Sequence, residues 1–395
     1  MRAATRVAGQ GLSPIRRMSL GAPESAVDLG LGEPGWPVPD VVGRGGTRAP
    51  SLSYGPNTSD PALVRAVARY ASTPTCDVAP DGVMVTAGSQ AALFALFQSW
   101  VEPGSTVLVP DPGFVAYPTL ARMCGATPVG YPLGADGGLD DDALVTALAE
   151  QPHTSLVVLN HPANPTGGLA SAPALSRVAE ACVDQGVLLV SDEVYAELWV
   201  DRRPASLRDV SPAGVVLGSM SKAFAAPGLR IGWALGAPDV LAPARLVHNA
   251  MTTAPSRLSQ AAALTILEAA DEVLPASRAE VRARWDAVDR IAPRLRTSGH
   301  RFLGDGHQEP MSRTAERAGF YLWLPLPDHL ADSTEHDGTP STEAFALRLR
   351  DEGGVTTIPG TAFGERGEGF LRVSLGGPVD DLEEGLRRLA PWWEA

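Results

Sequence analysis

The chain has 395 residues, more than one hydrophobic core usually holds, so two domains or a large domain with a smaller appended one are expected. A formal net charge of −13 argues against a nucleic-acid-binding surface. No segment is apolar enough to span a membrane, and the N-terminus lacks the apolar core of a signal peptide. Three widely separated cysteines and seven histidines show no disulfide or metal-ligand spacing. We therefore expect a cytoplasmic protein without a metal centre.

The first 70 residues predict two short elements, a loop and a helix. Residues 1–30 favour an amphipathic helix and a short strand. The Gly/Pro-rich run that follows cannot form regular structure, and it is either a connector or, around Gly32, a place where the backbone approaches a ligand. Ser59-Asp-Pro then supplies an N-cap and a first-turn proline for a helix that runs to Tyr70.

A strand from Val83 runs through a glycine turn directly into a helix. At the start of that helix, the backbone amides around Gly88, Ser89 and Gln90 would point outward and could bind an anion. Many strand–turn–helix units have glycines for tight turning only, so this signal is weak by itself.

Apolar strands continue to alternate with helices through the middle of the chain, with strands beginning near residues 83, 106, 155, 187, 215 and 231. This pattern predicts an α/β fold with a mostly parallel sheet covered by helices on both faces. In such sheets, ligands bind beyond the carboxyl ends of the strands. Five polar residues fall at or just beyond these predicted ends: Asn160, Asn164, Asp192, Ser219 and Lys222.

The last third of the chain predicts an α+β unit. Its predicted order is helices over 258–296, a polar segment 298–318, a strand from Gly319, a loop 327–342, a helix 343–352, short strands around Val355 and Arg372, and a helix 379–390. We predict a large domain over residues 45–285. A small domain would combine residues 1–44 with 286–395.

Lys222 is the only lysine among 32 basic residues; all the others are arginines. Unlike arginine, lysine can lose its proton and attack a carbonyl group. Lys222 lies between small and apolar residues, three positions after Ser219 and eight before Arg230. Chance substitution at a surface position is the alternative. The composition favours a lysine that forms a Schiff base.

An ordered set of motifs resembles the fold-type-I pyridoxal-phosphate enzymes, specifically the class I/II aminotransferases. The motifs are Asn164-Pro-Thr-Gly, Ser191-Asp-Glu-Val-Tyr, Ser219-Met-Ser-Lys with Arg230, and Phe370-Leu-Arg-Val-Ser. No single motif is specific, but the set in this order is, and it extends from Gly32 to the last helix. The resemblance implies a pyridoxal 5'-phosphate cofactor, a large cofactor-binding domain and a smaller domain.

The resemblance implies four roles around the cofactor ring. Lys222 would form a Schiff base with the cofactor aldehyde and shuttle a proton. Asp192 would keep the pyridine nitrogen protonated. Tyr195 and Asn164 would hydrogen-bond the phenolic oxygen, and Phe114 would stack on the ring. Each residue also has a structural alternative: a strand-end cap for Asp192, a core tyrosine for Tyr195 and a turn residue for Asn164.

The resemblance also assigns phosphate and substrate contacts. The phosphate group would be held by Ser219, Arg230 and the amides near Ser89 and Gln90. Tyr54 would reach the phosphate from a neighbouring subunit, which requires a homodimer; its alternative is a turn tyrosine.

Arg372 would grip the substrate α-carboxylate, assisted by Asn164 and the Gly32 backbone. Two further aromatic residues each have an alternative role. Trp36 indicates a pocket for a long or aromatic substrate side chain, or simple packing, and Tyr117 is a second candidate near Phe114 that is more often a packing residue.

The leading hypothesis is transamination between an L-amino acid and a 2-oxo acid. The same residues would also serve a β-eliminating carbon–sulfur lyase, and some relatives run cyclisation or oxidation. A cofactor-sensing transcription factor would need a long N-terminal extension, which we do not expect here. The arginine-rich, lysine-poor composition is typical of high-GC genomes, whose specialised pathways include aminotransferases for non-protein and arginine-derived amino acids.

Overall fold

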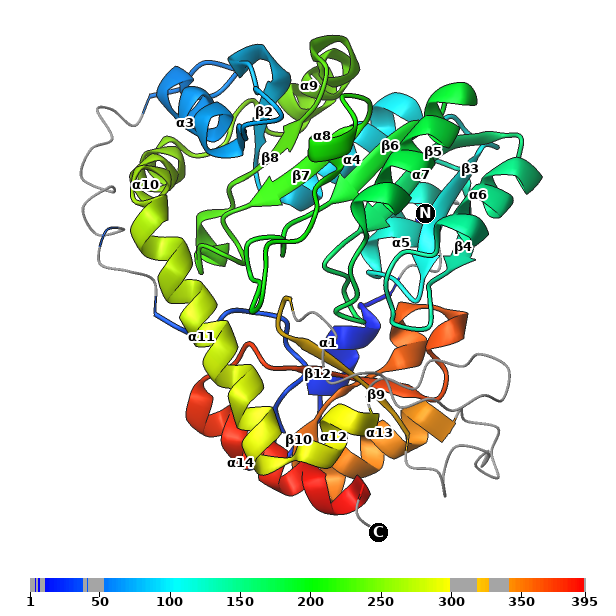
Figure 1. The fold of residues 1–395 in the computed structure, drawn as a ribbon, viewed down its shortest axis with the longest axis vertical. Helices are drawn as coiled ribbons and strands as arrows, with labels where there is room; N and C mark the ends of the chain where they lie inside the picture. The colour runs from blue at the N-terminus through cyan, green and yellow to red at the C-terminus, as the bar shows by residue number, and fades with distance from the viewer. Residues whose placement is uncertain are drawn as a thin grey trace.

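A computed structural model describes residues 4, 6–7, 11–37, 41, 53–298, 318–326 and 341–393. Figure 1 shows a large sheet with its helices in one half of the molecule and smaller sheets with their helices in the other. The large sheet has seven strands in the order β2-β8-β7-β6-β5-β3-β4. These strands are β2 (Val83–Thr86), β3 (Thr106–Asp111), β4 (Thr127–Pro132), β5 (Thr154–Asn160), β6 (Leu188–Asp192), β7 (Val215–Ser219) and β8 (Gly232–Leu235).

Neighbouring strands of the large sheet run parallel except around β8, which is antiparallel to both β2 and β7. The register pairs Asn160 at the end of β5 with Asp192 at the end of β6. It also pairs Ser219 at the end of β7 with Gly232 at the start of β8. The predicted α/β fold is confirmed, and the polar strand ends meet at one edge of the sheet.

Helices cover both faces of this sheet because alternate strand residues point to opposite sides. One apolar cluster packs Val158 and Leu217 against α4 (Ser89–Trp100), α5 (Ala116–Met123) and α9 (Pro238–Thr252). The other packs Val157 and Val216 with residues of α3 (Pro61–Ala71), α6 (Asp141–Glu150) and α7 (Ala172–Asp184). A short helix, α8 (Leu207–Val210), follows β6.

The second half of the molecule is built from both ends of the described chain. Strand β1 (Val27–Asp28) pairs in parallel with β10 (Val355–Thr356), and β11 (Ile358–Pro359), β12 (Phe370–Ser374) and β9 (Tyr321–Pro325) form an antiparallel sheet in that order. Helices α12 (Pro293–Ser298), α13 (Ser341–Asp351) and α14 (Val379–Leu389) belong to this half.

Two helices connect the halves. Helix α10 (Arg257–Glu268) is followed by α11 (Ala270–Ile291), which runs along one side of the molecule from the large sheet to the smaller ones (Figure 1). The predicted boundary at residue 285 falls inside α11, and the one at residue 45 lies outside the described residues, as do most of the segments 298–318 and 327–342. The domain boundaries stay a prediction.

Most of the predicted elements are present, with shifts of a few residues at their ends. The helix expected from Ser59 is α3, where the side chain of Asp60 accepts a hydrogen bond from the amide of Ala62 at 2.8 Å. The N-terminal helix is only the six residues of α1 (Pro14–Ser19). Sequence reasoning missed β4, whose exposed and proline-containing edge position hides the apolar pattern of a strand.

Within the described part of the chain, no helix has the length and hydrophobicity that a membrane crossing requires. The described histidine, cysteine and acidic side chains also form no group that could hold a metal ion.

Candidate active site

The polar strand ends of the large sheet face the loop that follows β1 and the sheet that contains β9 and β12. Lys222 lies in the loop after β7, and its Nζ donates a hydrogen bond to the carbonyl oxygen of Gly32 at 2.6 Å. The same Nζ lies over the rings of Tyr195 and Phe320, 5.5 Å and 5.9 Å from their centroids. The only lysine of the chain is therefore partly buried between the two halves of the molecule.

Asp192 is a buried carboxylate with one unpaired oxygen. Its side chain is 5% exposed, and Oδ2 accepts a hydrogen bond from the hydroxyl of Tyr117 at 2.8 Å. Among the described residues, Oδ1 has no hydrogen-bond partner. Burial raises the pKa of this carboxyl to about 6, although the Tyr117 hydroxyl and the charge of Lys222 act in the opposite direction. A donor placed at Oδ1 would stabilise the charged form.

Tyr117 therefore does more than the packing that its sequence position favours. Its ring also meets that of Phe114 edge to face, with centroids 5.6 Å apart. Phe114 is partly buried against the same apolar cluster.

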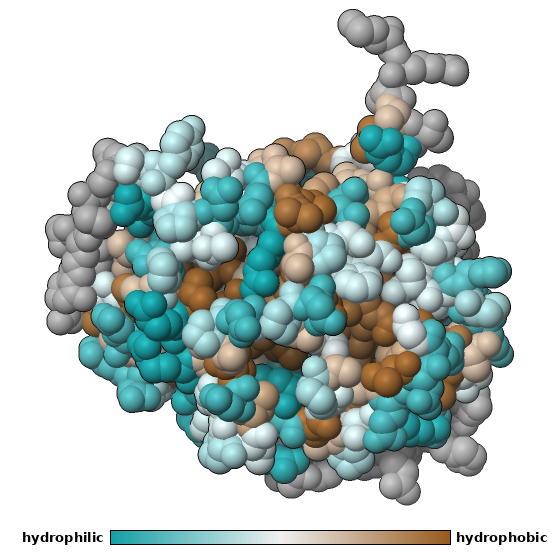
Figure 2. Space-filling model, turned by 90° about the horizontal axis from the view of Figure 1, so that it is seen from above, coloured by the Kyte–Doolittle hydropathy of each residue, from teal (hydrophilic) through white to brown (hydrophobic). Residues whose placement is uncertain are grey.

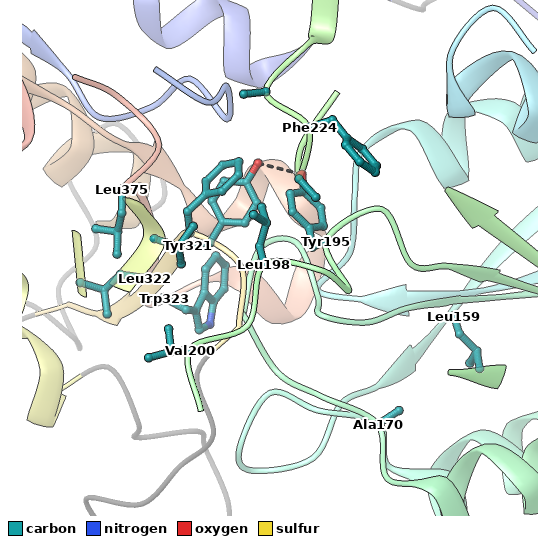
Figure 3. Packing of buried hydrophobic residues seen from close by; sticks show 14 of the residues in the cluster. Leu159, Ala170, Tyr195, Leu198, Val200, Phe224, Tyr321, Leu322, Trp323 and Leu375 are labelled. Carbon is teal, nitrogen blue, oxygen red and sulfur yellow. Dashed lines mark hydrogen bonds between the residues drawn. The ribbon is translucent and has the colours of Figure 1, made fainter. Parts of the chain in front are cut away.

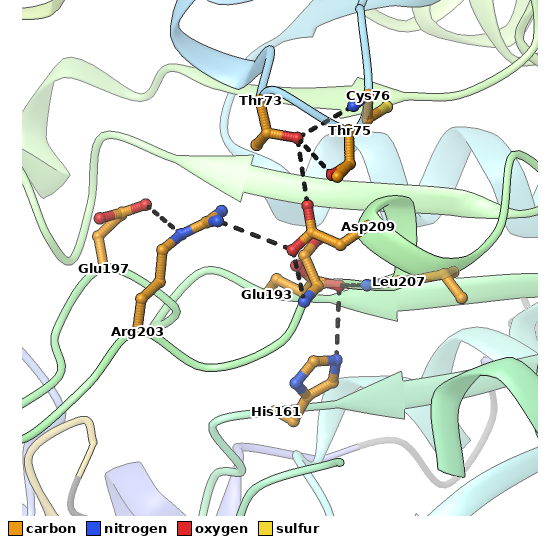
Figure 4. A network of polar contacts seen from close by, with 10 residues as sticks. Thr73, Thr75, Cys76, His161, Glu193, Glu197, Arg203, Leu207 and Asp209 are labelled. Atoms are coloured by element: carbon orange, nitrogen blue, oxygen red, sulfur yellow. Dashed lines mark hydrogen bonds and ion pairs between the residues drawn. The ribbon is translucent and has the colours of Figure 1, made fainter. Parts of the chain in front are cut away.

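The neighbouring Glu193 is also buried, and one of its oxygens has several partners. Its Oε1 accepts hydrogen bonds from Ser191 Oγ and from the amide of Leu207, both at 2.9 Å, and lies 3.4 Å from His161 Nε2. Figure 4 shows His161 and Glu193 beside a second group of polar side chains that includes Asp209 and Thr73. Sequence reasoning did not single out His161 or Glu193. Of the two adjacent carboxylates, Asp192 is the one with an oxygen that is buried without a hydrogen-bond partner among the described residues.

Tyr195, a predicted site residue, forms a hydrogen bond with a residue that sequence reasoning missed. The hydroxyls of Tyr195 and Tyr321 are 3.0 Å apart, and both side chains are buried (Figure 3). Burial also raises the pKa of Tyr195 well above its ordinary value, so this hydroxyl stays protonated. Tyr321 resembles an ordinary core residue of an apolar strand, and no sequence signal distinguishes it.

Arg372 is a buried guanidinium without an acidic partner. Its side chain is 1% exposed; Nη1 donates to Asn164 Oδ1 at 2.8 Å and Nη2 donates to the carbonyl oxygen of Gly30 at 2.5 Å. Nε has no partner, and no carboxylate of the described residues forms an ion pair with this arginine. Burial lowers the pKa of the guanidinium. Such a buried cation is costly unless an anion joins it.

Asn164, which accepts a hydrogen bond from Arg372, is also bonded to Asn160. The backbone amide of Asn164 donates to Asn160 Oδ1 at 2.7 Å, and Asn160 Nδ2 donates to the carbonyl oxygen of Asp192 at 2.8 Å. These bonds fix the loop after β5 to the end of β6.

The start of α4 and Arg230 form a second cluster. Gly88 precedes the helix with φ 87°, and a Cβ added there would lie 2.5 Å from Arg230 Nη2. Only glycine fits both the backbone conformation and this close approach. Ser89 and Gln90 open the helix, where amide groups lack intrahelical acceptors. Ser219 lies nearby through the β7–β8 pairing, and its hydroxyl contacts Ser221 at 2.9 Å.

Two predicted site residues lie elsewhere. Trp36 is 5% exposed, its indole N–H donates to Ser277 Oγ at 3.3 Å, and the Arg284 guanidinium lies 4.9 Å from the ring centroid. These contacts favour packing, the alternative that the sequence left open, and the substrate contact of Trp36 stays a prediction. Tyr54 is 92% exposed and stands outside the cluster within this single chain.

Comparison with known proteins decides the family. The family model "Aminotransferase class I and II" matches residues 27–389. The chain belongs to the class I and II aminotransferases. Aminotransferases of this family and fold use pyridoxal phosphate, so the protein is a pyridoxal-phosphate-dependent aminotransferase. The named relatives of this chain are aminotransferases, so they do not favour a β-eliminating lyase.

Among the relatives of this aminotransferase, LL-diaminopimelate aminotransferase of Desulforudis audaxviator is 31% identical over 92% of this chain and 89% of its own. Arginine–pyruvate transaminase of Pseudomonas aeruginosa is 32% identical over 78% of this chain and 74% of its own. Among solved structures, Thermus thermophilus aspartate aminotransferase with maleate aligns with a TM-score of 0.85 and 28% identity, covering 99% of this chain and 100% of that one.

Proposed function

We propose that this aminotransferase uses Lys222 to transfer the amino group of an L-amino acid to a 2-oxo acid, and that the donor is a non-protein or arginine-derived amino acid. The observation that carries the proposal is a pair of incompletely bonded buried groups in the same part of the molecule as the lysine. Among the described residues, Asp192 Oδ1 and Arg372 Nε have no hydrogen-bond partner, and no carboxylate forms an ion pair with Arg372. The carboxylate of Asp192 would bind the protonated ring nitrogen of the cofactor, and the guanidinium of Arg372 would bind the carboxylate of an amino acid.

The residues present fit pyridoxal phosphate. Asp192 would hold a proton on the ring nitrogen through Oδ1, Tyr195 and Asn164 would bind the phenolic oxygen, and Phe114 would cover the ring. The phosphate group would be bound by the set around the start of α4, namely Gly88, Ser89, Gln90, Ser219 and Arg230. When bound, the cofactor supplies a ring that accepts the electrons released at the substrate Cα.

In the proposed reaction, Lys222 transfers the proton. Its Nζ would hold the cofactor covalently until the substrate amine takes its place, and would then remove the proton from the substrate Cα. The carbonyl oxygen of Gly32, 2.6 Å from Nζ, orients the amine. Arginine at this position could not release a proton.

Arg372 would bind the α-carboxylate of the donor, together with Asn164 and the backbone near Gly32. The free Nε and the two Nη groups supply a fork that matches a carboxylate. This contact recognises amino acids as a class, and the side chain of the donor is selected elsewhere.

An arginine-derived donor is supported by two observations. The relative from Pseudomonas aeruginosa is named as an arginine–pyruvate transaminase, and the net charge of −13 is consistent with a cationic substrate, although most of these charges are solvated. Other relatives are named for aspartate, which is a competitor in the test, and for LL-diaminopimelate, which is itself a non-protein amino acid.

We also propose a cytoplasmic homodimer in which Tyr54 reaches the phosphate of the neighbouring subunit. The high exposure of Tyr54 supports this, together with the exposed apolar side chains of Leu246, Met251 and Leu258 on α9 and α10. Figure 2 looks down on the end of the molecule where α3 and α9 lie and shows apolar residues interspersed with polar ones. The three cysteines are free, as a reducing compartment requires. Sedimentation of the purified protein tests the dimer.

One experiment tests the chemistry and the donor together. The protein purified with pyridoxal phosphate is mixed with single amino acids, and loss of the cofactor absorbance band is recorded for arginine, ornithine, aspartate, LL-diaminopimelate and phenylalanine. We expect the largest change with a cationic, arginine-derived donor, and we expect Lys222→Arg to lack the borohydride-sensitive band.

Three outcomes contradict the proposal. Reaction with aspartate or phenylalanine alone would refute the donor. Release of pyruvate or ammonia without a 2-oxo acid would indicate elimination. A wild-type protein that binds no cofactor would refute the site.

A further inference from the structure

Tyr321 on β9 contacts both sides of the proposed site, although its sequence marks it only as a core residue. Its side chain is buried, its hydroxyl oxygen lies 3.0 Å from that of Tyr195, and its ring faces Arg372. Figure 3 shows the two hydroxyls pointing toward each other from different segments of the chain. One side chain therefore touches a residue assigned to the cofactor and a residue assigned to the substrate.

The hydroxyl contact has a definite direction when Tyr195 serves the cofactor. A tyrosine hydroxyl donates one proton, and Tyr195 would donate that proton to the phenolic oxygen. Tyr321 must then donate to Tyr195. A hydroxyl that accepts one hydrogen bond becomes a stronger donor of another. The Tyr321 hydroxyl thus strengthens the bond from Tyr195 and fixes its direction.

The ring of Tyr321 holds the guanidinium of Arg372 in place. The guanidinium carbon is 4.5 Å from the centroid of Tyr321 and 4.8 Å from that of Phe363. Aromatic contacts of this kind attract a desolvated cation and restrict the plane of its fork. With Nη1 and Nη2 bound to Asn164 and Gly30, these contacts leave few orientations for the free Nε.

Gly32 provides the space that Tyr321 occupies. A Cβ added at Gly32 would lie 2.0 Å from the Tyr321 hydroxyl oxygen, far inside contact distance. The carbonyl oxygen of the same glycine accepts the hydrogen bond from Lys222. The position of Tyr321 is therefore tied to the loop that orients the lysine.

We propose that Tyr321 is a positioning residue for the aminotransfer reaction: its hydroxyl aligns Tyr195 and its ring aligns Arg372. This inference rests on the proposed roles of Tyr195 and Arg372. The two contacts separate experimentally, because Tyr321→Phe removes the hydroxyl and keeps the ring, whereas Tyr321→Leu removes both.

The test uses the holoenzyme and the best donor of the wild-type protein. The readouts are kcat, KM for the donor, and the pH midpoint of the absorbance change of the bound cofactor. A weaker hydrogen bond to the phenolic oxygen leaves more negative charge there, so the proton on the nitrogen that joins Lys222 is held more tightly. For Tyr321→Phe we expect the midpoint to rise by about 0.7 of a pH unit and kcat to fall about fivefold, with KM unchanged. For Tyr321→Leu we expect KM to rise about tenfold in addition.

Tyr131→Phe is the matched control. Tyr131 is also buried, and its hydroxyl donates to the carbonyl oxygen of Val158 at 2.8 Å, outside the site. This variant loses a comparable hydrogen bond, so we expect wild-type kcat, KM and midpoint.

A Tyr321→Phe enzyme with the wild-type midpoint, even with a reduced kcat, would overturn the role of the hydroxyl. A Tyr321→Leu enzyme with wild-type KM would overturn the role of the ring. A wild-type protein without a borohydride-sensitive band or transamination would instead refute the proposed function, and this inference with it.

Discussion

The buried carboxyl of Asp192 makes the cofactor-free protein less stable as pH rises. Burial raises its pKa from 3.8 to about 6, so the folded protein holds this proton more tightly than the unfolded chain does. The cost of the charge is absent below the unfolded pKa, grows between the two values and is complete above about pH 7. A difference of about two pKa units corresponds to roughly 3 kcal/mol, about half of which appears between pH 5 and pH 8.

Asp192→Asn removes this pH-dependent cost. We measure the melting temperatures of the cofactor-free wild type and variant at pH 5 and pH 8, with exposed Glu102→Gln as the control. The melting-temperature advantage of the variant should grow by about 1 to 2 °C at the higher pH, since the entropy of unfolding of a chain this long converts roughly half of that cost to a shift of this size. Effects of the substitution that do not depend on pH cancel when the differences in melting temperature at pH 5 and pH 8 are compared. With pyridoxal phosphate added, the wild type should gain more than the variant.

A difference in melting temperature that is the same at both pH values would refute this reasoning. It would mean that Asp192 is charged in the cofactor-free protein without penalty, and that its free oxygen is already paired in solution. If pyridoxal phosphate raised the melting temperature of the variant as much as that of the wild type, this would contradict the assignment of Asp192 to the ring nitrogen.

Two other substitutions test the neighbourhood of the site. Gly88→Ala places a methyl group against Arg230 at a positive φ, and we expect about tenfold weaker binding of pyridoxal phosphate to the cofactor-free protein. An unchanged dissociation constant in a fluorescence titration would argue against the phosphate site. Trp36→Phe removes the hydrogen bond to Ser277 and should cost about 1 kcal/mol of stability in urea without changing KM. A raised KM for the donor would instead support a contact between Trp36 and the substrate.

The fold and the centre of the site could be predicted from the sequence because both follow from one rule. Apolar strands alternating with helices imply a parallel sheet, and a parallel sheet brings the carboxyl ends of its strands to one edge. Residues that follow those strands, such as Asn164, Asp192 and Lys222, could therefore be grouped before their contacts were known.

The aromatic partners could not be predicted in the same way. Tyr117 begins a helix and Tyr321 lies in an apolar strand, and in both settings a tyrosine is an ordinary core residue. Their hydroxyls acquire a role only through tertiary pairing with Asp192 and Tyr195. For Trp36 the sequence leaves both a substrate contact and packing open, because a glycine-rich loop near the site is also where a large ring can fill the space beneath it.

The two adjacent buried carboxylates, Asp192 and Glu193, have pKa values that are shifted in opposite directions. For Glu193, burial raises the pKa, but bonding to His161 and the amide of Leu207 outweighs burial and lowers it. For Asp192, burial prevails and the pKa rises, although the hydroxyl of Tyr117 and the backbone amide of Val194 act in the opposite direction. A fold that supplies several partners to one buried acid could supply them to its neighbour. The free oxygen of Asp192 is therefore best explained by a ligand that completes its bonding.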